Sequence, residues 1–308
     1  MTRNTDLLLT AIAPAIWGST YLVTTEFLPD GYPFTVAMLR ALPAGLLLLL
    51  LVRQLPAGIW WLKVFLLGAL NFSIFWWLLF VAAYRLPGGV AATVAAIQPL
   101  IVIVLARPLL GSPVRALAVI AAVAGMSGVA LLILTPQAAL DPIGIAAGLA
   151  GAVSMAGGTV LSRRWQPPVS LLTFTSWQLT AGGILLLPAA LWLEPSLPGL
   201  TGANILGLVY LGLIGAAFTY ILWFRGIARL QPSVVATLGF LSPMTAVVLG
   251  WWVLGQNLSP LQVVGMFIVL GSVWLSQRAG RSKPTATLAP AVRSPFQSPM
   301  KRCSTPTL

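Results

Sequence analysis

The chain has 308 residues, of which 58% are hydrophobic and 7% charged, whereas a water-soluble protein is about 25% charged. It has no histidine, five acidic residues and one cysteine, which excludes most metal sites, histidine-dependent catalysis and an internal disulfide, so no metal, cofactor or enzymatic activity is expected. The net charge is +12, but the charged residues lie between apolar runs and do not form a patch, which argues against nucleic-acid binding. A multi-pass membrane protein is the class that fits this composition.

Apolar runs of about 20 residues, each long enough to cross ~30 Å of hydrocarbon, recur along the chain. Short connections that contain proline, glycine and charged residues separate them. They predict an all-α integral membrane fold with ten transmembrane helices, at Leu7–Phe27, Phe34–Val52, Leu62–Tyr84, Gly88–Leu105, Ala116–Leu134, Ile143–Ser162, Leu171–Leu193, Ile205–Trp223, Val234–Leu254 and Leu261–Gln277.

The charges predict how this bundle is oriented. Basic residues concentrate in alternate connections, and the opposite connections hold four of the five acids and only Arg85 among the basic residues. Because cytoplasmic loops carry the excess of Lys and Arg, both termini are predicted to lie in the cytoplasm of a protein of the bacterial inner membrane. Residues 278–308 are polar, basic and rich in Pro, Ser and Thr, which predicts a disordered cytoplasmic tail.

An internal repeat divides the membrane part into two halves. At an offset of 144, Arg85–Gly111 aligns without a gap on Arg229–Gly255, and an earlier register at an offset of 138 pairs Arg40 with Gln178. Five helices are an odd number, so the second copy enters the membrane from the opposite side. The sequence thus predicts a five-plus-five inverted repeat over residues 1–137 and 138–277, an architecture suited to alternating access.

Two short motifs carry a family resemblance. Trp17-Gly18-Ser19 in the first helix and the run Leu258–Gln262 before the last, with the inverted repeat, resemble the drug/metabolite transporter superfamily, and within it the EamA-domain exporters. The resemblance covers Leu7–Gln277. It implies export of amino acids and related small molecules, aromatic amino acids in some members, and no short motif assigns the substrate.

Prolines occur at equivalent positions of the fourth and ninth helices. Pro99 and Pro243 are expected to leave the carbonyls of Ala95 and Gly239, four residues earlier, without a helical donor. We interpret the pair as hinges around a central site, because these prolines repeat while others do not. A static packing kink is the alternative.

Polar residues on or near these helices are candidates to bind a substrate in a dry pocket. Gln98 is the leading one, since it offers two donors and an acceptor beside the proline. For any single Ser or Thr, a hydrogen bond within or between helices is the simpler reading. The full set of polar candidates is Asn71, Thr93, Gln98, Thr237, Ser242 and Thr245.

Aromatic residues form a second group of candidates. The third helix carries Phe72, Trp76 and Phe80 on nearly one face, which predicts an aromatic wall if the face points inward and has no functional meaning if it faces lipid. Trp17 belongs to the motif described above. Tyr210, Phe218 and Tyr220 of the eighth helix supply a possible facing wall.

Arg40 is the one ionisable residue well inside a predicted span. A charge at the bilayer centre costs about 3 kcal/mol, so it needs a partner or a route to the surface. A structural pair with Glu26 is the favoured expectation, and attraction of a substrate carboxylate is the alternative.

The sequence therefore predicts a transporter that exports amino acids, aromatic or bulky apolar ones first. No carboxylate or histidine lies at mid-membrane, which favours a facilitator over proton-coupled antiport. The alternative function is transport of other cargo, such as drugs, cations or lipids, on the same fold. The partners expected are the substrate and the lipid bilayer, and the protein is expected to be a monomer, with a dimer as the alternative.

Overall fold

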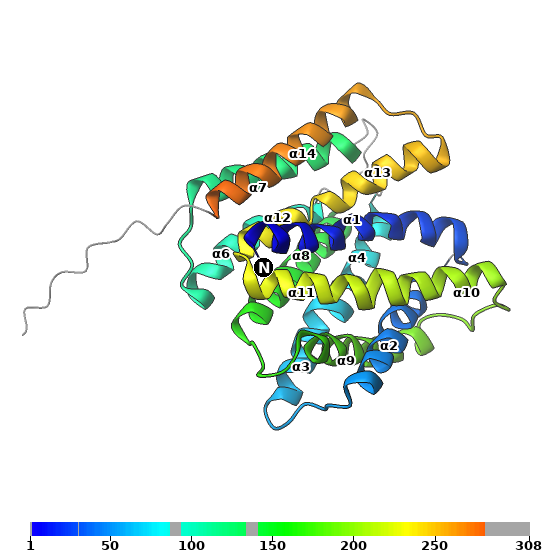
Figure 1. Ribbon diagram of the computed structural model, residues 1–308. Coiled ribbons are helices and arrows are strands. Elements are labelled where there is room, and N and C mark those ends of the chain that lie inside the picture. The colour runs from blue at the N-terminus through cyan, green and yellow to red at the C-terminus, as the bar shows by residue number, and fades with distance from the viewer. Residues whose placement is uncertain (1, 30, 87–93, 134–140, 281–308) are drawn as a thin grey trace, which may run out of the picture.

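The computed structural model describes residues 2–29, 31–86, 94–133 and 141–280, and every element assigned there is a helix (Figure 1). Two of them, η1 and η2, are π-helical. The elements are α1 (Arg3–Phe27), α2 (Pro33–Val52), α3 (Trp60–Gly68), η1 (Ala69–Ser73), α4 (Ile74–Arg85), α6 (Gln98–Leu110), α7 (Ala116–Ile133), α8 (Pro142–Arg164), α9 (Leu171–Trp192), α10 (Gly202–Val209), η2 (Tyr210–Phe218), α11 (Thr219–Arg229), α12 (Pro232–Leu238), α13 (Leu241–Leu254) and α14 (Pro260–Ala279).

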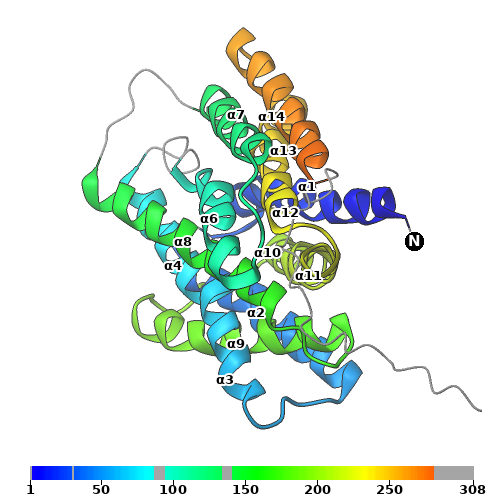
Figure 2. The ribbon, with the colours of Figure 1, turned by 90° about the vertical axis from the view of Figure 1, so that its left-hand side faces the viewer.

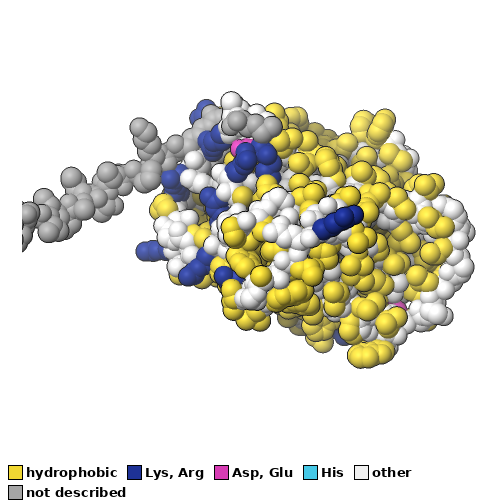
Figure 3. All heavy atoms as spheres, turned by 60° about the horizontal axis from the view of Figure 1, so that its bottom comes forward, with side chains coloured by type: hydrophobic (Ala, Val, Ile, Leu, Met, Phe, Trp, Pro, Cys, Tyr) yellow, Lys and Arg dark blue, Asp and Glu magenta, His cyan; other side chains and the backbone are white. Residues whose placement is uncertain are grey.

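The described chain contains nine apolar helices long enough to cross a membrane, when consecutive segments count as one, and the shorter apolar helix α6. The all-helical membrane fold is thus confirmed. Part of the fourth predicted span, with Thr93, and the tail from residue 281 lie outside the described residues. Hydrophobic side chains cover most of the face seen in Figure 3, while most visible Lys and Arg side chains lie towards one end, as in a bundle embedded in lipid.

The third and eighth spans each change from α- to π-helical winding at the same place. η1 covers Ala69–Ser73, and its positions shifted by 144 fall inside η2, Tyr210–Phe218. π-Helical turns are rare and occur mostly at functional sites. The repeat seen in the sequence is therefore also a repeat of local backbone geometry.

The fourth and ninth spans are broken ahead of Pro99 and Pro243. Turn residues at 96–97 precede α6, and turn residues at 239–240 separate α12 from α13. Pro243 has no N–H to donate to the Gly239 carbonyl, as expected, but this carbonyl is not left unsatisfied, because the backbone N–H of Ser242 donates to it over 3.1 Å. A tighter turn, with a hydrogen bond from the residue three positions later, thus satisfies the carbonyl to which proline cannot donate.

The contacts between helices come in pairs related by the inverted repeat. α2 packs along α9 and α7 along α14, and each of these pairs joins equivalent helices of the two halves (Figures 1 and 2). The contact of α1 with α13 has its counterpart in that of α6 with α8, and α1 with α11 corresponds to α4 with α8. This pairing is what two oppositely oriented copies of one fold produce.

Two glycines at equivalent positions of the repeat allow α2 and α9 to pack closely. A Cβ on Gly45 would lie 2.5 Å from the backbone nitrogen of Thr180, and a Cβ on Gly183 would lie 2.7 Å from that of Leu42. The offset of 138 exchanges Gly45 with Gly183 and Leu42 with Thr180, so the two contacts are images of each other. In lipid, close packing of small residues is a main source of helix association.

We expect Gly45→Val and Gly183→Val each to destabilise the protein by about 3 kcal/mol, because the added side chain meets backbone atoms that cannot move aside. Thermal unfolding in detergent measures the loss. Gly271→Val in α14 is the matched control, since nothing lies near that exposed helical glycine. Equal stability of all three variants would contradict the proposed packing.

Candidate functional site

A cavity of about 540 Å³ lies between the two halves and extends to the connection between α1 and α2. Its walls come from α1, α2, α4, α6 and α7 of the first half and from α8, η2, α11, α12 and α13 of the second. The sequence-predicted residues on these walls are Trp17, Trp76, Phe80, Gln98, Pro99, Ser242 and Pro243, together with Tyr220. Residues from ten helical elements of the two halves thus meet at one place.

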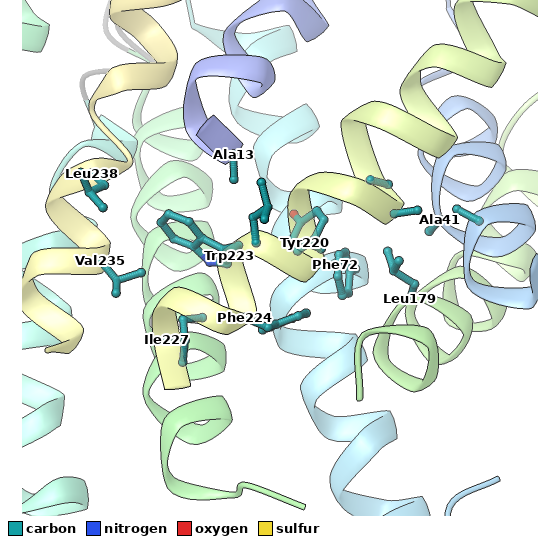
Figure 4. Close-up of a cluster of buried hydrophobic side chains, with 14 of the residues drawn as sticks. Ala13, Ala41, Phe72, Leu179, Tyr220, Trp223, Phe224, Ile227, Val235 and Leu238 are labelled. Atoms are coloured by element: carbon teal, nitrogen blue, oxygen red, sulfur yellow. The ribbon is translucent and has the colours of Figure 1, made fainter. Parts of the chain in front are cut away.

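Aromatic rings form one side of the cavity. The Trp17 ring lies 4.9 Å from Tyr220 and 5.0 Å from Trp223, centroid to centroid. Behind them the fully buried Phe72 lies 4.6 Å from Tyr220 and 5.4 Å from Trp76, so it supports the wall without lining it (Figure 4). Tilted and edge-on ring pairs at these separations favour a fixed apolar surface.

A single backbone carbonyl connects three helices at this wall. The Gly215 oxygen in η2 accepts hydrogen bonds from Trp17 Nε1 at 3.2 Å, Arg40 Nη2 at 2.7 Å and Thr219 Oγ1 at 2.9 Å. Trp17 Nε1 also donates to Thr219 Oγ1 at 2.9 Å. Because π-helical winding displaces carbonyls from regular α-helical partners, side chains can satisfy them. The Gly215 carbonyl therefore fixes the positions of Trp17 and Arg40.

Arg40 lies on the cavity wall instead of pairing with Glu26. Besides its bond to Gly215, its guanidinium lies 5.3 Å from the ring centre of Trp76. Glu26 is exposed, and the structure shows no ion pair between the two side chains within the described residues. The expected structural pair with Glu26 is thus not formed among the described residues, and Arg40 is one of the residues that line the cavity.

The motif Trp17-Gly18-Ser19 holds α1 against the second half. A Cβ on Gly18 would lie 2.5 Å from the Ser242 carbonyl oxygen, so only glycine allows α1 to approach the break of the ninth span this closely. Ser19 Oγ lies 2.7 Å from the Tyr210 hydroxyl. All three motif residues therefore act at the interface of the two halves, beside the cavity.

Other predicted site residues lie away from the cavity. Asn71 is buried and donates to Gln178 Oε1 at 2.9 Å and to Ser162 at 3.2 Å, and Thr237 is bonded to Ser233 and Ser276. Tyr210 is held by Ser19, and Phe218 is 44% exposed on the outer surface. Thr93 lies outside the described residues.

Sequence reasoning missed Trp223, Phe240 and Tyr32, which also line the cavity. Trp223 follows Tyr220 by three residues, a spacing that places both on one helical face and could have identified it. Phe240 lies within the break of the ninth span. Tyr32 lies in a connection, where periodicity gives no signal.

The end of the bundle opposite the α1–α2 connection is closed by charge pairs and close packing. Asp6 accepts from Arg225 at 2.7 Å and from Arg229 at 3.4 Å, and its side chain is only 10% exposed. Beside it, a side chain on Gly226 would collide with Thr10, so α1 and α11 are in direct contact.

The opposite end holds a looser counterpart of this charge pair. Arg85, the repeat mate of Arg229, lies 3.7 Å from Asp141, and the two side chains are 46% and 35% exposed. Each end of the bundle thus has an ion pair that links the two halves, tight at the closed end and loose at the open one.

Comparisons with known proteins give a consistent result. The model of the EamA-like transporter family matches residues 5–134 and again residues 142–277. Protein PecM of Dickeya dadantii is 45% identical over 86% of this chain and 90% of its own, and the uncharacterized inner membrane transporter YedA of Escherichia coli K12 is 30% identical over 84% and 86%. A solved crystal structure superposes with a TM-score of 0.77 over 91% of this chain and all of its own at 22% identity, which shows the fold.

We expect Asp6→Asn to destabilise the protein by about 3 kcal/mol, because it leaves two arginines at a largely buried site without their carboxylate. Asp141→Asn is the matched control: that pair is exposed and worth at most about 1 kcal/mol, and asparagine still caps α8 at Gly144. Thermal unfolding of both variants tests the difference. Equal losses would show that the closed end does not depend on Asp6.

Proposed function

The chain belongs to the EamA-like transporter family and is a membrane transporter, and on this basis we propose that it exports amino acids, aromatic or bulky apolar ones first, and related metabolites. Two halves of opposite orientation support alternating access to one central site. The alternatives are transport of drugs, cations or lipids by the same fold, and proton-coupled antiport.

The cavity carries this proposal. Its volume of about 540 Å³ lies in the range of small-molecule sites, about 300–1,000 Å³. The aromatic wall formed by Trp17, Trp76 and Tyr220 suits a flat or bulky apolar side chain. Arg40 supplies the donors that a carboxylate needs, and Gln98 and Ser242 offer acceptors for an ammonium group.

The orientation proposed from the charges makes this conformation outward-open. Arg225, Arg229 and the N-terminus lie at the closed end, which the positive-inside rule assigns to the cytoplasm. The open end, with the connection between α1 and α2, then faces the periplasm of the bacterial inner membrane. Both termini are proposed to be cytoplasmic.

The lining residues also favour facilitated transport. No described lining residue is Asp, Glu or His, so the usual carrier of a coupled proton is missing from the described cavity wall. Asp6 at the closed end is the carboxylate that an antiport mechanism would use. Flux of labelled phenylalanine into proteoliposomes should not respond to an imposed pH gradient. A strong response that Asp6→Asn abolishes would replace the facilitator with proton-coupled antiport.

Arg40→Gln should weaken binding of phenylalanine about tenfold or more, because a charge-assisted hydrogen bond is worth about 1.5–3 kcal/mol. The fold tolerates glutamine at the equivalent position, Gln178. Phenylalanine methyl ester, which lacks the carboxylate, is the control ligand, and its binding should change little. Wild-type protein that binds neither compound would instead favour other cargo.

Trp76→Leu should reduce phenylalanine flux at least about tenfold, since it removes a ring of the cavity wall and the support of the Arg40 guanidinium. Trp77→Leu is the matched control, because the neighbouring ring is 49% exposed and does not line the cavity. Trp17→Ala and Gln98→Ala test the two remaining leading residues. A variant that folds and transports normally removes its residue from the site.

A further inference from the structure

A second cavity, of about 240 Å³, lies at the closed end and is separate from the transport cavity. It is lined by residues of α6, α7, α8 and α12 and of the connections before α7 and α12, and α6 and α12 each contact the other three helices. The first two helices belong to the first half of the protein and the other two to the second. A ligand in this place would therefore touch both halves where they meet.

Two arginines line this cavity. Arg115, just before α7, donates to the carbonyl of Ala279, and Arg163, near the end of α8, donates through Nη1 to the carbonyl of Ile227 at 3.0 Å. Both side chains are half-buried, and these bonds fix their directions. Arginines that are already ordered lose less conformational entropy when they bind a ligand.

The charges of Arg115 and Arg163 have no carboxylate near them in the described chain. Asp6, the acidic residue at this end, is engaged by Arg225 and Arg229, while the other described acids lie at the opposite end or in its connections. Two half-buried cations that line the same cavity favour an anion between them. The guanidinium group binds phosphate with two parallel hydrogen bonds.

The remaining lining residues are both polar and apolar. Ser112, Gln231 and Ser233 are polar, whereas Ile103 and Leu110 of α6 are apolar. A phosphate head group that continues into hydrocarbon can use both kinds of lining residue, and a free phosphate ion can use only the polar ones. Basic pockets between transmembrane helices on the cytoplasmic side are a known form of anionic-lipid site.

We propose that this cavity binds the phosphate head group of an anionic phospholipid, which joins α7 of one half to α8 and α12 of the other. The bound lipid stabilises the conformation in which the closed end is closed. The site is independent of the transported solute. Lipid charge in the inner leaflet would thereby bias which side the transport cavity faces.

Native mass spectrometry of the full chain, titrated with phosphatidylglycerol or phosphatidylcholine, tests the site. Wild-type protein should retain phosphatidylglycerol preferentially, and Arg115→Gln and Arg163→Gln should each weaken its binding about fivefold. Arg107→Gln and Arg164→Gln are matched controls, because these exposed arginines lie on the same helices, or next to them, without lining the cavity. Equal binding by the test and control variants would overturn the proposal.

A thermal-shift experiment distinguishes binding of the lipid from binding of a free anion. It also remains valid if a variant is less stable than wild type, because each shift is measured within one protein. The quantity compared is the increase in melting temperature on adding phosphatidylglycerol, relative to the same protein in phosphatidylcholine. This increase should be present in wild type and in Arg164→Gln and reduced in Arg163→Gln. An equal increase with inorganic phosphate alone would show that the site takes a small anion and would contradict the lipid assignment.

Discussion

Within a bilayer no water is present to satisfy a backbone carbonyl, so the protein must supply the donors itself. At Gly215 the π-helical winding of η2 presents such a carbonyl, and Trp17, Arg40 and Thr219 donate to it. The bonds from Trp17 and Arg40 bring α1 and α2 of the first half onto the eighth span, to which Thr219 itself belongs. They also decide what the central cavity offers a solute, because they fix an indole ring and a guanidinium on its wall.

The two halves use the same backbone device with different side chains. The equivalent of Gly215 at the 144 offset is Asn71, and the equivalent of Arg40 at the 138 offset is Gln178. The side chains of Asn71 and Gln178 form a buried hydrogen bond with each other. One π-helical site thus holds a cation at an open cavity, and the other holds neutral amides in the closed core. The architecture is symmetric, while the chemistry available to cargo is not.

Hydropathy and coincident Pro, Gly and Arg residues were enough to predict the helical membrane fold and the repeat, since both depend on composition and period. Side-chain directions around η2 could not be predicted. The prediction placed Tyr210 and Phe218 on one face by assuming 3.6 residues per turn. The segment between them is π-helical and has more residues per turn, so this assumption fails and Phe218 points outward. The bond from Arg40 to the Gly215 carbonyl could not be predicted either, because every residue has a backbone carbonyl and the sequence does not show which one is available to a side chain.

The ion pairs at the two ends have a kinetic consequence. A perfectly symmetric carrier would populate both orientations equally, but Asp6 has two arginines and little exposure, whereas Asp141 has one distant arginine and is open to solvent. In the proposed alternating-access cycle, the empty carrier would therefore rest in the orientation that the Asp6 contacts close, and breaking these contacts would limit its return. If a bound solute lowers the free-energy barrier to breaking the Asp6 contacts, the exchange of one solute for another across the membrane will be faster than net efflux.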